Sequence, residues 1–259
     1  MKKLARWQSA ARGFLIPVIL LVVAQIAGMV AGGGSDSLAP PSEVITAGWR
    51  ALSDGTIFRA SRETLVVVIT GLSIGVAIGV PLGLLFGVNA TANRLAEFTV
   101  ESIRPIPSVA LIPVALLSFG LGYKMEIAIV AFSSTWPNLI MTRAAVAGIE
   151  PRLREVARVL GFGPIARITK IILPAALPRI FVGFRLAAAV ALIVAVTVEI
   201  TANPYGLGFA LMDAQQSLRP DLMLAMLAWV GLVGWTLNKL LISAQRRLFG
   251  AAALVEEIR

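Results

Sequence analysis

Long apolar blocks, each about as long as a membrane is thick, constrain this chain more than any other feature. Hydrophobic residues make up 58% of the 259 residues, and only 14% are charged. A helix needs about 20 apolar residues to cross a bilayer. The blocks predict six spans, at about Phe14–Ala31, Thr64–Val88, Ile106–Leu121, Ile127–Met141, Ile180–Ala202 and Leu222–Ile242. We therefore expect an all-α, polytopic membrane protein in which residues 1–259 form a single transmembrane domain.

The first predicted span has two interpretations. Lys2, Lys3, Arg6 and Arg12 precede an apolar run, as basic residues do in a secretory signal peptide. The run is long for a signal core and its end is weakly defined, so we favour a retained helix. Removal of the segment stays open as the alternative, and either outcome leaves the rest of the topology unchanged.

Positive charge is distributed unevenly between the segments that connect the spans. With the N-terminus inside, the inner segments carry 17 Lys and Arg residues and the outer segments carry 5, while Arg185 lies within a span. Cytoplasmic loops of membrane proteins are enriched in Lys and Arg. We therefore expect both termini on the cytoplasmic side of the lipid bilayer. The net charge of +9 is accounted for in this way, and no nucleic acid partner is predicted.

The chain lacks residues on which many enzymes and metal sites depend. It contains no cysteine and no histidine, which excludes disulfides, thiolate metal sites and catalysis by Cys-His or Ser-His-Asp groups. No Gly-x-x-x-x-Gly-Lys-Ser/Thr phosphate loop occurs. An intramembrane enzyme is the least supported class, because no two carboxylates pair within a predicted span. We expect a protein that is not an enzyme and has no metal site or cofactor of its own.

A regular row of glycines runs through the second predicted span. One glycine occurs every four residues, at Gly71, Gly75, Gly79, Gly83 and Gly87. Small residues at this spacing let a second helix approach closely within a membrane. The row drifts around the helix, and a proline at position 81 interrupts it. We therefore expect helix packing as the role of the row, with no single partner helix using all five glycines.

The outer loop at about 32–63 follows the first span. It opens with glycines and then reads Pro40-Pro41-Ser42, which predicts a flexible link followed by a short helix. Ser42 is the expected N-cap of that helix, since a serine oxygen accepts a bond from the first free backbone N–H groups. Trp49 would lie in the helix as an interfacial aromatic residue.

A basic segment between the fourth and fifth spans has the pattern of two short helices. Leu153, Val156, Ala157 and Leu160 fall on one helical face, and charged residues fall on the other. Gly161 suits the position just past the helix end. A second short helix is predicted from Pro164 to about Leu173, giving a compact knob. The alternative is an amphipathic segment that rests on lipid headgroups.

The same segment carries a spaced motif. It reads Glu155-Val156-Ala157, three residues, Gly161, nine residues, then Ile171-x-Leu173-Pro174. This resembles the signature loop of permease subunits of ATP-binding-cassette (ABC) importers, with Val156 in place of the usual alanine. The resemblance implies a type I importer fold, a bacterial cytoplasmic (inner) membrane location and a cytoplasmic coupling loop at about 143–179. It also implies that these seven motif residues dock a separate ABC ATPase, which binds ATP and Mg.

A second resemblance concerns the third span. Its entry reads Arg104-Pro105-Ile106-Pro107-Ser108-x-Ala110-Leu111-Ile112-Pro113, followed by Phe119-Gly120. With Gly183-x-Arg185 and Gly206-Leu207-Gly208, it resembles the nitrate, taurine and alkanesulfonate branch of these permeases, over roughly Thr56 to Phe249. The branch implies a small nutrient such as nitrate, a sulfonate or taurine as cargo. Specificity within such systems often lies in the substrate-binding protein.

Four residues are candidates for the translocation path. Prolines in the third span leave backbone carbonyls without partners, which predicts a broken helix start beside a cavity at Pro107 and Ser108. Arg185 and Glu199 are the charges within a span. They are separated by about 21 Å of helix and cannot pair with each other. Each is equally well interpreted as a structural clamp or as part of the path.

The leading hypothesis is the permease subunit of an ABC importer that works by alternating access. The resemblance implies an ATPase, a second permease copy in a homodimer, and a periplasmic or lipid-anchored substrate-binding protein as partners. The outer segment with Asp213, Gln215 and Gln216 is a candidate contact for that protein, or a solvated loop helix. The alternative function is a gradient-driven secondary transporter or channel, which predicts buried acidic relays or repeats.

Overall fold

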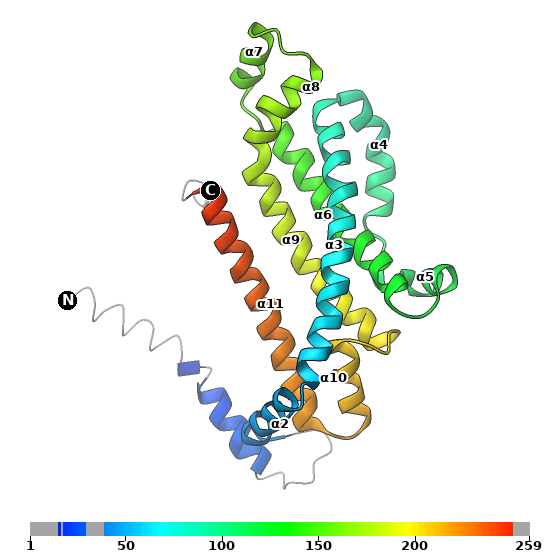
Figure 1. Ribbon diagram of the computed structural model, residues 1–259, viewed down its shortest axis with the longest axis vertical. Coiled ribbons are helices and arrows are strands. Elements are labelled where there is room, and N and C mark those ends of the chain that lie inside the picture. Colours follow the sequence, from blue (N-terminus) through cyan, green and yellow to red (C-terminus); the bar gives the residue numbers. More distant parts are fainter. Residues whose placement is uncertain (1–14, 17, 30–38, 251–259) are drawn as a thin grey trace, which may run out of the picture.

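The computed structural model describes residues 15–16, 18–29 and 39–250, and every regular element among them is helical (Figure 1). The helices follow one another as Val18–Met29, α2 (Pro41–Ser53), α3 (Thr56–Val88), α4 (Ala90–Ile103), a 3₁₀ turn (Ser108–Leu111), α5 (Ile112–Phe119), α6 (Tyr123–Ala147), α7 (Pro151–Val159), α8 (Pro164–Arg167), a π-helical turn (Ile168–Ile172), α9 (Leu173–Thr201), α10 (Leu207–Gln216) and α11 (Pro220–Phe249). The all-α prediction is confirmed.

Three long helices, α3, α6 and α9, form the centre of the molecule. α6 packs against both of the others, and buried apolar side chains from all three form the main core, among them Val67, Ile129 and Ala191. α2 and α10 gather at one end of these helices, and α7 and α8 lie at the opposite end (Figure 1). We call these the α10 end and the α7 end. α11 runs beside α9, and few of its residues are buried.

The predicted spans correspond to helices, with shifted bounds. Three helices are long and apolar enough to cross a membrane: Thr56–Val88, Pro164–Thr201 and Pro220–Phe249. α6 covers the predicted fourth span with 25 residues, about 37 Å of helix, but polar residues such as Ser134, Asn138 and Thr142 lie along its buried face. The first predicted span, Phe14–Ala31, lies partly outside the described residues. Within the described part, a helix covers Val18–Met29.

The third span starts with a break, as its prolines predict, but its bounds differ from Ile106–Leu121. α5 contributes only eight residues, and the apolar stretch is completed by α4, which meets the Ser108–Phe119 segment at a bend of 83°. Prolines at 105 and 107 explain the break, because proline lacks the N–H that helix continuation requires. The chain there forms a broken span or a re-entrant segment.

The outer loop also differs in detail. α2 and the first two turns of α3 occupy much of the region 32–63. Pro40 is the N-cap of α2, and it makes no side-chain cap bond, so the prediction of a Ser42 cap is wrong. The Ser42 hydroxyl instead accepts a hydrogen bond from the Gln25 amide at 3.0 Å, and Ser42 N–H donates to Gln25 Oε1 at 3.1 Å. This exchange ties the helix Val18–Met29 to α2.

The glycine row lies against a single helix along its whole length. A Cβ placed on Gly71, Gly79, Gly83 or Gly87 would approach Val130, Thr135, Leu139 or Val146 of α6 to 2.5–2.6 Å, and one on Gly75 would collide with Ser134. The expectation that no single partner uses all five glycines is therefore wrong. α6 presents its own row at four-residue intervals (Val130, Ser134, Asn138, Thr142 and Val146), so the two rows drift around their helices together. We call this contact the α3–α6 seam.

The seam predicts that even a methyl group at its centre is destabilising. Gly79→Ala places Cβ 2.5 Å from the Thr135 carbonyl oxygen, and overpacking of this kind costs about 1–3 kcal/mol. Gly231→Ala on α11 is the control, because nothing lies within 4 Å of its Cβ position and alanine favours a helix by about 1 kcal/mol. Thermal unfolding of the purified variants in detergent measures the difference. Equal melting temperatures for both would contradict the seam.

Candidate functional site

The motif segment at the α7 end is built around the end of α7. Phe162 N–H donates to the Ala157 carbonyl at 3.1 Å, and Gly161 has a φ of +64°. A glycine with positive φ and a bond of this span form a Schellman motif, which satisfies the last carbonyls of a helix. Ala157 is 1% exposed. The motif's alanine and glycine therefore fix the shape of the turn.

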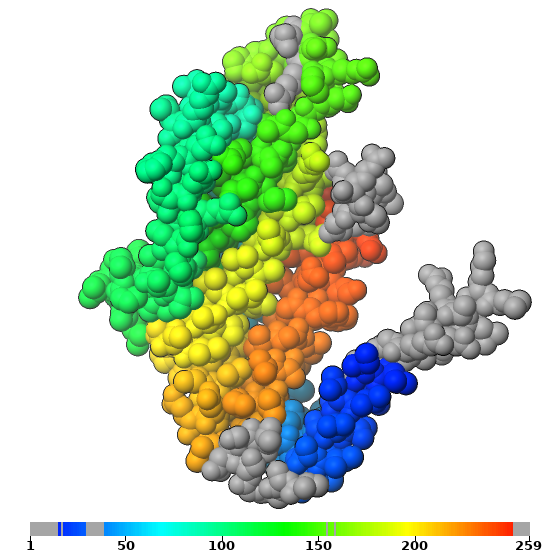
Figure 2. All heavy atoms as spheres, turned by 180° about the vertical axis from the view of Figure 1, so that it is seen from behind, coloured from blue at the N-terminus to red at the C-terminus, as the bar shows by residue number. Residues whose placement is uncertain are grey.

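The rest of the α7 surface faces outward. Glu155 and Gly161 are exposed, Val156 is 48% exposed and Leu160 is 58% exposed. The apolar stripe predicted on this helix is thus mostly uncovered within the chain. Figure 2 shows the α7–α8 segment as one tip of the molecule. An exposed apolar face next to a charge is a surface that a partner protein or lipid would cover.

The second half of the motif is the start of a long helix. Ile171 lies in the π-helical turn, and Leu173 and Pro174 begin α9. α8, the π turn and α9 form one continuous helix of 38 residues, Pro164–Thr201. The predicted second short helix therefore does not end near Leu173. Because no break separates the loop from the span, the motif is directly continuous with the transmembrane core.

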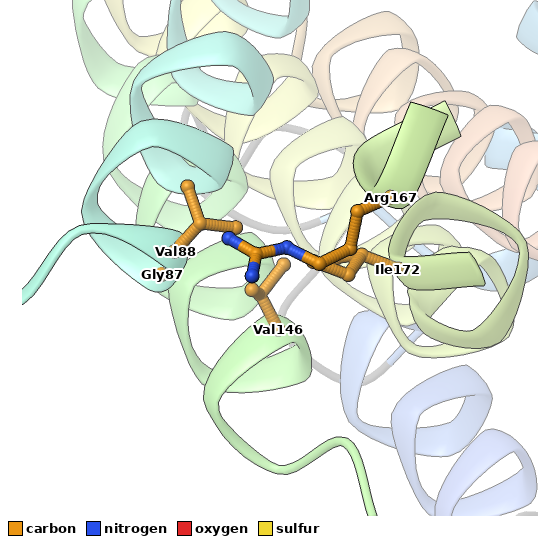
Figure 3. Close-up of a pocket in the computed structure, with 5 residues that line it drawn as sticks. All are labelled: Gly87, Val88, Val146, Arg167 and Ile172. Atoms are coloured by element: carbon orange, nitrogen blue, oxygen red, sulfur yellow. The ribbon is translucent and has the colours of Figure 1, made fainter. Parts of the chain in front are cut away.

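Arg167 connects this segment to the α3–α6 seam. Its side chain crosses a cavity of about 150 Å³ lined by Gly87, Val88, Val146 and Ile172, with the guanidinium between Val88 and Val146 (Figure 3). α3 ends at Val88 and α6 ends one residue after Val146, so the cation lies at two helix C-termini. A positive charge is favourable there. Arg167 belongs to the short helix predicted from Pro164, and the sequence pattern does not indicate its contact with α3 and α6.

At the α10 end, two glutamates meet inside the protein. Glu126 of α6 is 0% exposed and Glu199 of α9 is 1% exposed, and their side chains are within hydrogen-bonding reach of each other. Asn203 Nδ2 donates to Glu126 Oε2. The statement that no carboxylates pair within a span is therefore wrong. Glu126 was missed because it directly precedes the predicted fourth span, where it was not counted as an intramembrane charge.

The N-terminus of α10 is held by side-chain oxygens from two other helices. Gly206 N–H donates to Glu63 Oε2 at 3.0 Å, Leu207 N–H to Thr64 Oγ1 at 2.9 Å, and Gly208 N–H to Glu199 Oε2 at 2.8 Å. The first backbone N–H groups of a helix have no partner within it, and these three bonds supply one for each. The sequence Asn203-Pro204-Tyr205-Gly206 predicts a turn, but it does not indicate these three bonds.

The four residues predicted for the translocation path have separate environments. Arg185 Nη1 donates to Oε1 of the buried Gln245 at 2.7 Å, which joins α9 to α11. Glu199 belongs to the polar cluster at the α10 end. Pro107 is exposed and Ser108 half-buried in the bend before α5. The structure thus gives Arg185 and Glu199 structural contacts, and it does not bring the four together.

A cavity of about 310 Å³ lies beside this cluster. Its lining includes Glu199, Asn203, Asp213 and Gln216. The polar residues come from α9, α10 and the turn between them, so the cavity lies at the α10 end. Within the part of the chain that the structure describes, no group of three or more Asp or Glu residues is arranged to hold a metal ion.

Residues 75–251 match a family described as "Binding-protein-dependent transport system inner membrane component". The matched region is more than half of the chain. The chain belongs to this family. It is therefore a multi-pass permease of the inner membrane and a transport subunit, as the motif at positions 155–174 predicted.

Two sulfonate permeases and a bicarbonate permease are similar to most of the chain. It is 31% identical over 229 residues to the putative aliphatic sulfonates transport permease protein SsuC of Escherichia coli K12, covering 88% of this chain and 87% of the relative. It is 27% identical to the protein of the same name in Bacillus subtilis 168, with coverage of 92% and 86%. It is 30% identical to the bicarbonate transport system permease protein CmpB of Synechococcus elongatus, with coverage of 76% and 68%.

Solved structures confirm the predicted fold. A chain of the inward-facing MetNI methionine ABC transporter matches with a TM-score of 0.65 at 21% identity, covering 71% of this chain and 92% of that one. A chain of an amino acid ABC transporter crystallised with histidines matches with a TM-score of 0.57 at 22% identity, covering 73% and 92%. The type I importer permease fold predicted from the motifs is therefore the observed fold.

The α10 N-terminus generates a prediction about Gly206. Gly206 and Gly120 have nearly the same backbone, with φ of 94° and 74° and ψ of −177° and 176°. Alanine at either position strains the backbone by about 1–3 kcal/mol. Only at Gly206 would its Cβ also collide, there with the Glu199 carboxylate. We expect Gly206→Ala to lower the melting temperature more than Gly120→Ala, and equal shifts would contradict the packed arrangement.

Proposed function

We propose that this chain is the permease subunit of an ABC importer for a small oxyanion or sulfur-containing nutrient, such as an aliphatic sulfonate, taurine or nitrate. The sulfonate and bicarbonate permeases among its relatives support this substrate class. A substrate-binding protein, periplasmic or lipid-anchored, delivers the nutrient to the α10 end. Alternating access then exposes the path to the two sides of the membrane in turn.

A separate ABC ATPase docks on the α7 end, which faces the cytoplasm together with both termini. The observation that supports this proposal is the outward-facing motif surface on a turn held by Ala157 and Gly161. ATP and Mg are bound by that ATPase, and this chain contributes the coupling contact through Glu155, Val156, Gly161 and the Ile171–Pro174 region. A second copy of the chain completes the path, and the outward-projecting α5, on which Leu117 is 90% exposed, is a surface that this copy would cover.

Gly161→Asp tests the docking surface. We expect the variant to insert into the membrane but to lose the ATPase on affinity purification, because the added carboxylate lies on the contact surface. Glu155→Ala should weaken the association without abolishing it. The measurement is co-elution of the ATPase with the tagged chain from mild detergent, from cells that express the neighbouring genes.

Gly250→Asp is the matched control. Gly250 also has a positive φ, of 70°, and open space around its Cβ position, but it lies at the end of α11. Normal co-elution of the Gly161→Asp variant would overturn the placement of the interface. An ATPase-free preparation of the unaltered chain would favour the gradient-driven transporter instead.

Arg167 is the residue that we expect to link docking to transport. Because it reaches from the loop to the ends of α3 and α6, it makes the loop, α9 and the seam move together. Arg167→Ala should retain the ATPase and its hydrolysis but lower the amount of substrate transported per ATP severalfold. Transport and hydrolysis are measured on the same proteoliposomes.

Lys170→Ala is the control for loss of a positive charge in the same loop, since the Lys170 ammonium lies over the Phe162 ring, 5.3 Å from its centre. It should keep the ratio of transport to hydrolysis. If Arg167→Ala also keeps that ratio, the link between loop and seam is not made by Arg167.

A further inference from the structure

We propose that Glu126 and Glu199 form a proton-binding site, in which one proton shared between the two carboxyls fastens α6 to α9 at the α10 end. The proton is held by Glu126 and is donated to Glu199, which stays ionised at the N-terminus of α10. Neither docking nor substrate recognition requires this site, so it stands apart from the proposed function.

The two carboxyl groups have more hydrogen-bond acceptors than donors around them. Each carboxyl has one oxygen that already accepts a hydrogen bond: Glu126 Oε2 from Asn203, and Glu199 Oε2 from Gly208 N–H. The other two oxygens, Glu126 Oε1 and Glu199 Oε1, are buried and have no donor among the described residues. Two carboxylates cannot bond to each other, because both are acceptors only. A single proton between the carboxyls supplies the missing donor and satisfies both oxygens.

The charges around the pair also favour a shared proton. The charges that act most strongly on it are themselves carboxylates, since each acts on the other and Glu63 also acts on Glu199. Two ionised carboxylates in contact and away from water repel strongly, and sharing one proton removes that repulsion. Other titratable groups near this end include the phenols of Tyr123 and Tyr205, which stack on each other, Arg62, which acts on Tyr123, and Asp213, which lines the cavity beside Glu199.

The surroundings of the two carboxyls indicate which one holds the proton. Glu199 Oε2 accepts a hydrogen bond from the Gly208 N–H at the start of α10. A helix N-terminus carries partial positive charge, which favours an anion there. Glu126 has only the Asn203 amide and Glu199 as partners. The negative charge therefore belongs on Glu199 and the proton on Glu126.

The consequence is a junction of four helices that depends on one proton. Glu126 brings in α6, Glu199 brings in α9, and both are bonded to the segment Asn203–Gly208 that leads into α10. Glu63 and Thr64 attach α3 to the same segment. Loss of the proton would leave two facing anions at the centre of this junction and push α6 and α9 apart.

Infrared spectroscopy of the purified chain in lipid nanodiscs tests the site directly. We expect a carbonyl band of a protonated, hydrogen-bonded carboxylic acid at neutral pH that shifts on exchange into D₂O. Glu126→Gln should remove this band while keeping the fold, because its amide can still accept from Asn203 and donate to Glu199. Glu63→Gln, at the same helix terminus, should retain the band.

Thermal unfolding provides a second readout. The glutamates of an unfolded chain are ionised at neutral pH, so a folded state that holds an extra proton loses stability as the pH rises through its release. The melting temperature of the unaltered chain and of Glu63→Gln should fall as the pH rises, and that of Glu126→Gln should change less.

Absence of the acid band in the unaltered chain, or its persistence in Glu126→Gln, would overturn the proposal. A melting temperature that depends on sodium or potassium in place of pH would overturn it too, since a cation would then neutralise the pair. These outcomes leave the proposed function intact, because no ATPase or substrate enters either measurement.

Discussion

The close contact between α3 and α6 is the constraint on which the other features depend. Glycines along one helix let the backbone of the other approach until no Cβ fits between them, and the contact extends over about 24 Å. Such a contact is well suited to a membrane, where packing and hydrogen bonding replace the hydrophobic effect as the force that holds helices together. The two helices are thereby fixed to each other from the α10 end to the α7 end.

Each end of the seam carries a polar feature that the packing positions. At the α7 end, Arg167 lies where α3 and α6 stop, and at the α10 end Glu126 starts α6 next to Glu199. Arg143 of α6 adds a bond to Asn93, at 3.2 Å, which fixes α4 to the same unit. Buried polar groups in a membrane protein are costly unless they are paired, and here they are concentrated where helices must be joined. Gly183 gives α9 a similarly close contact with α6, because a Cβ at Gly183 would collide with Met141 of α6.

The helical class, most of the spans and the motif loop were predictable from the sequence, because apolar length, charge placement and residue spacing are properties of the chain read in one dimension. The prolines near Pro107 predicted a broken helix start, but not that α4 completes the span at a bend of 83°. That completion, the fusion of α8 with α9 and the use of the whole glycine row by α6 were not predicted. Each depends on which helix a residue meets in space. The Glu126–Glu199 contact joins positions 73 residues apart, and nothing in the sequence around either carboxylate indicates its partner. Arg185 could be recognised as an intramembrane charge, but its partner Gln245 could not.

The unbroken helix from Pro164 to Thr201 joins the α7 end of the molecule directly to the α10 end. Its 38 residues extend for about 57 Å, so a tilt of about 5° displaces one end relative to the other by about 5 Å. A small rotation of this helix therefore displaces the α10 end relative to the α7 end by nearly the rise of one helical turn. The π-helical turn at Ile168–Ile172 lies near the α7 end of this helix, and it makes the helix wider there by adding a residue to the turn. The length of this helix thus sets how far a given rotation displaces its two ends from each other.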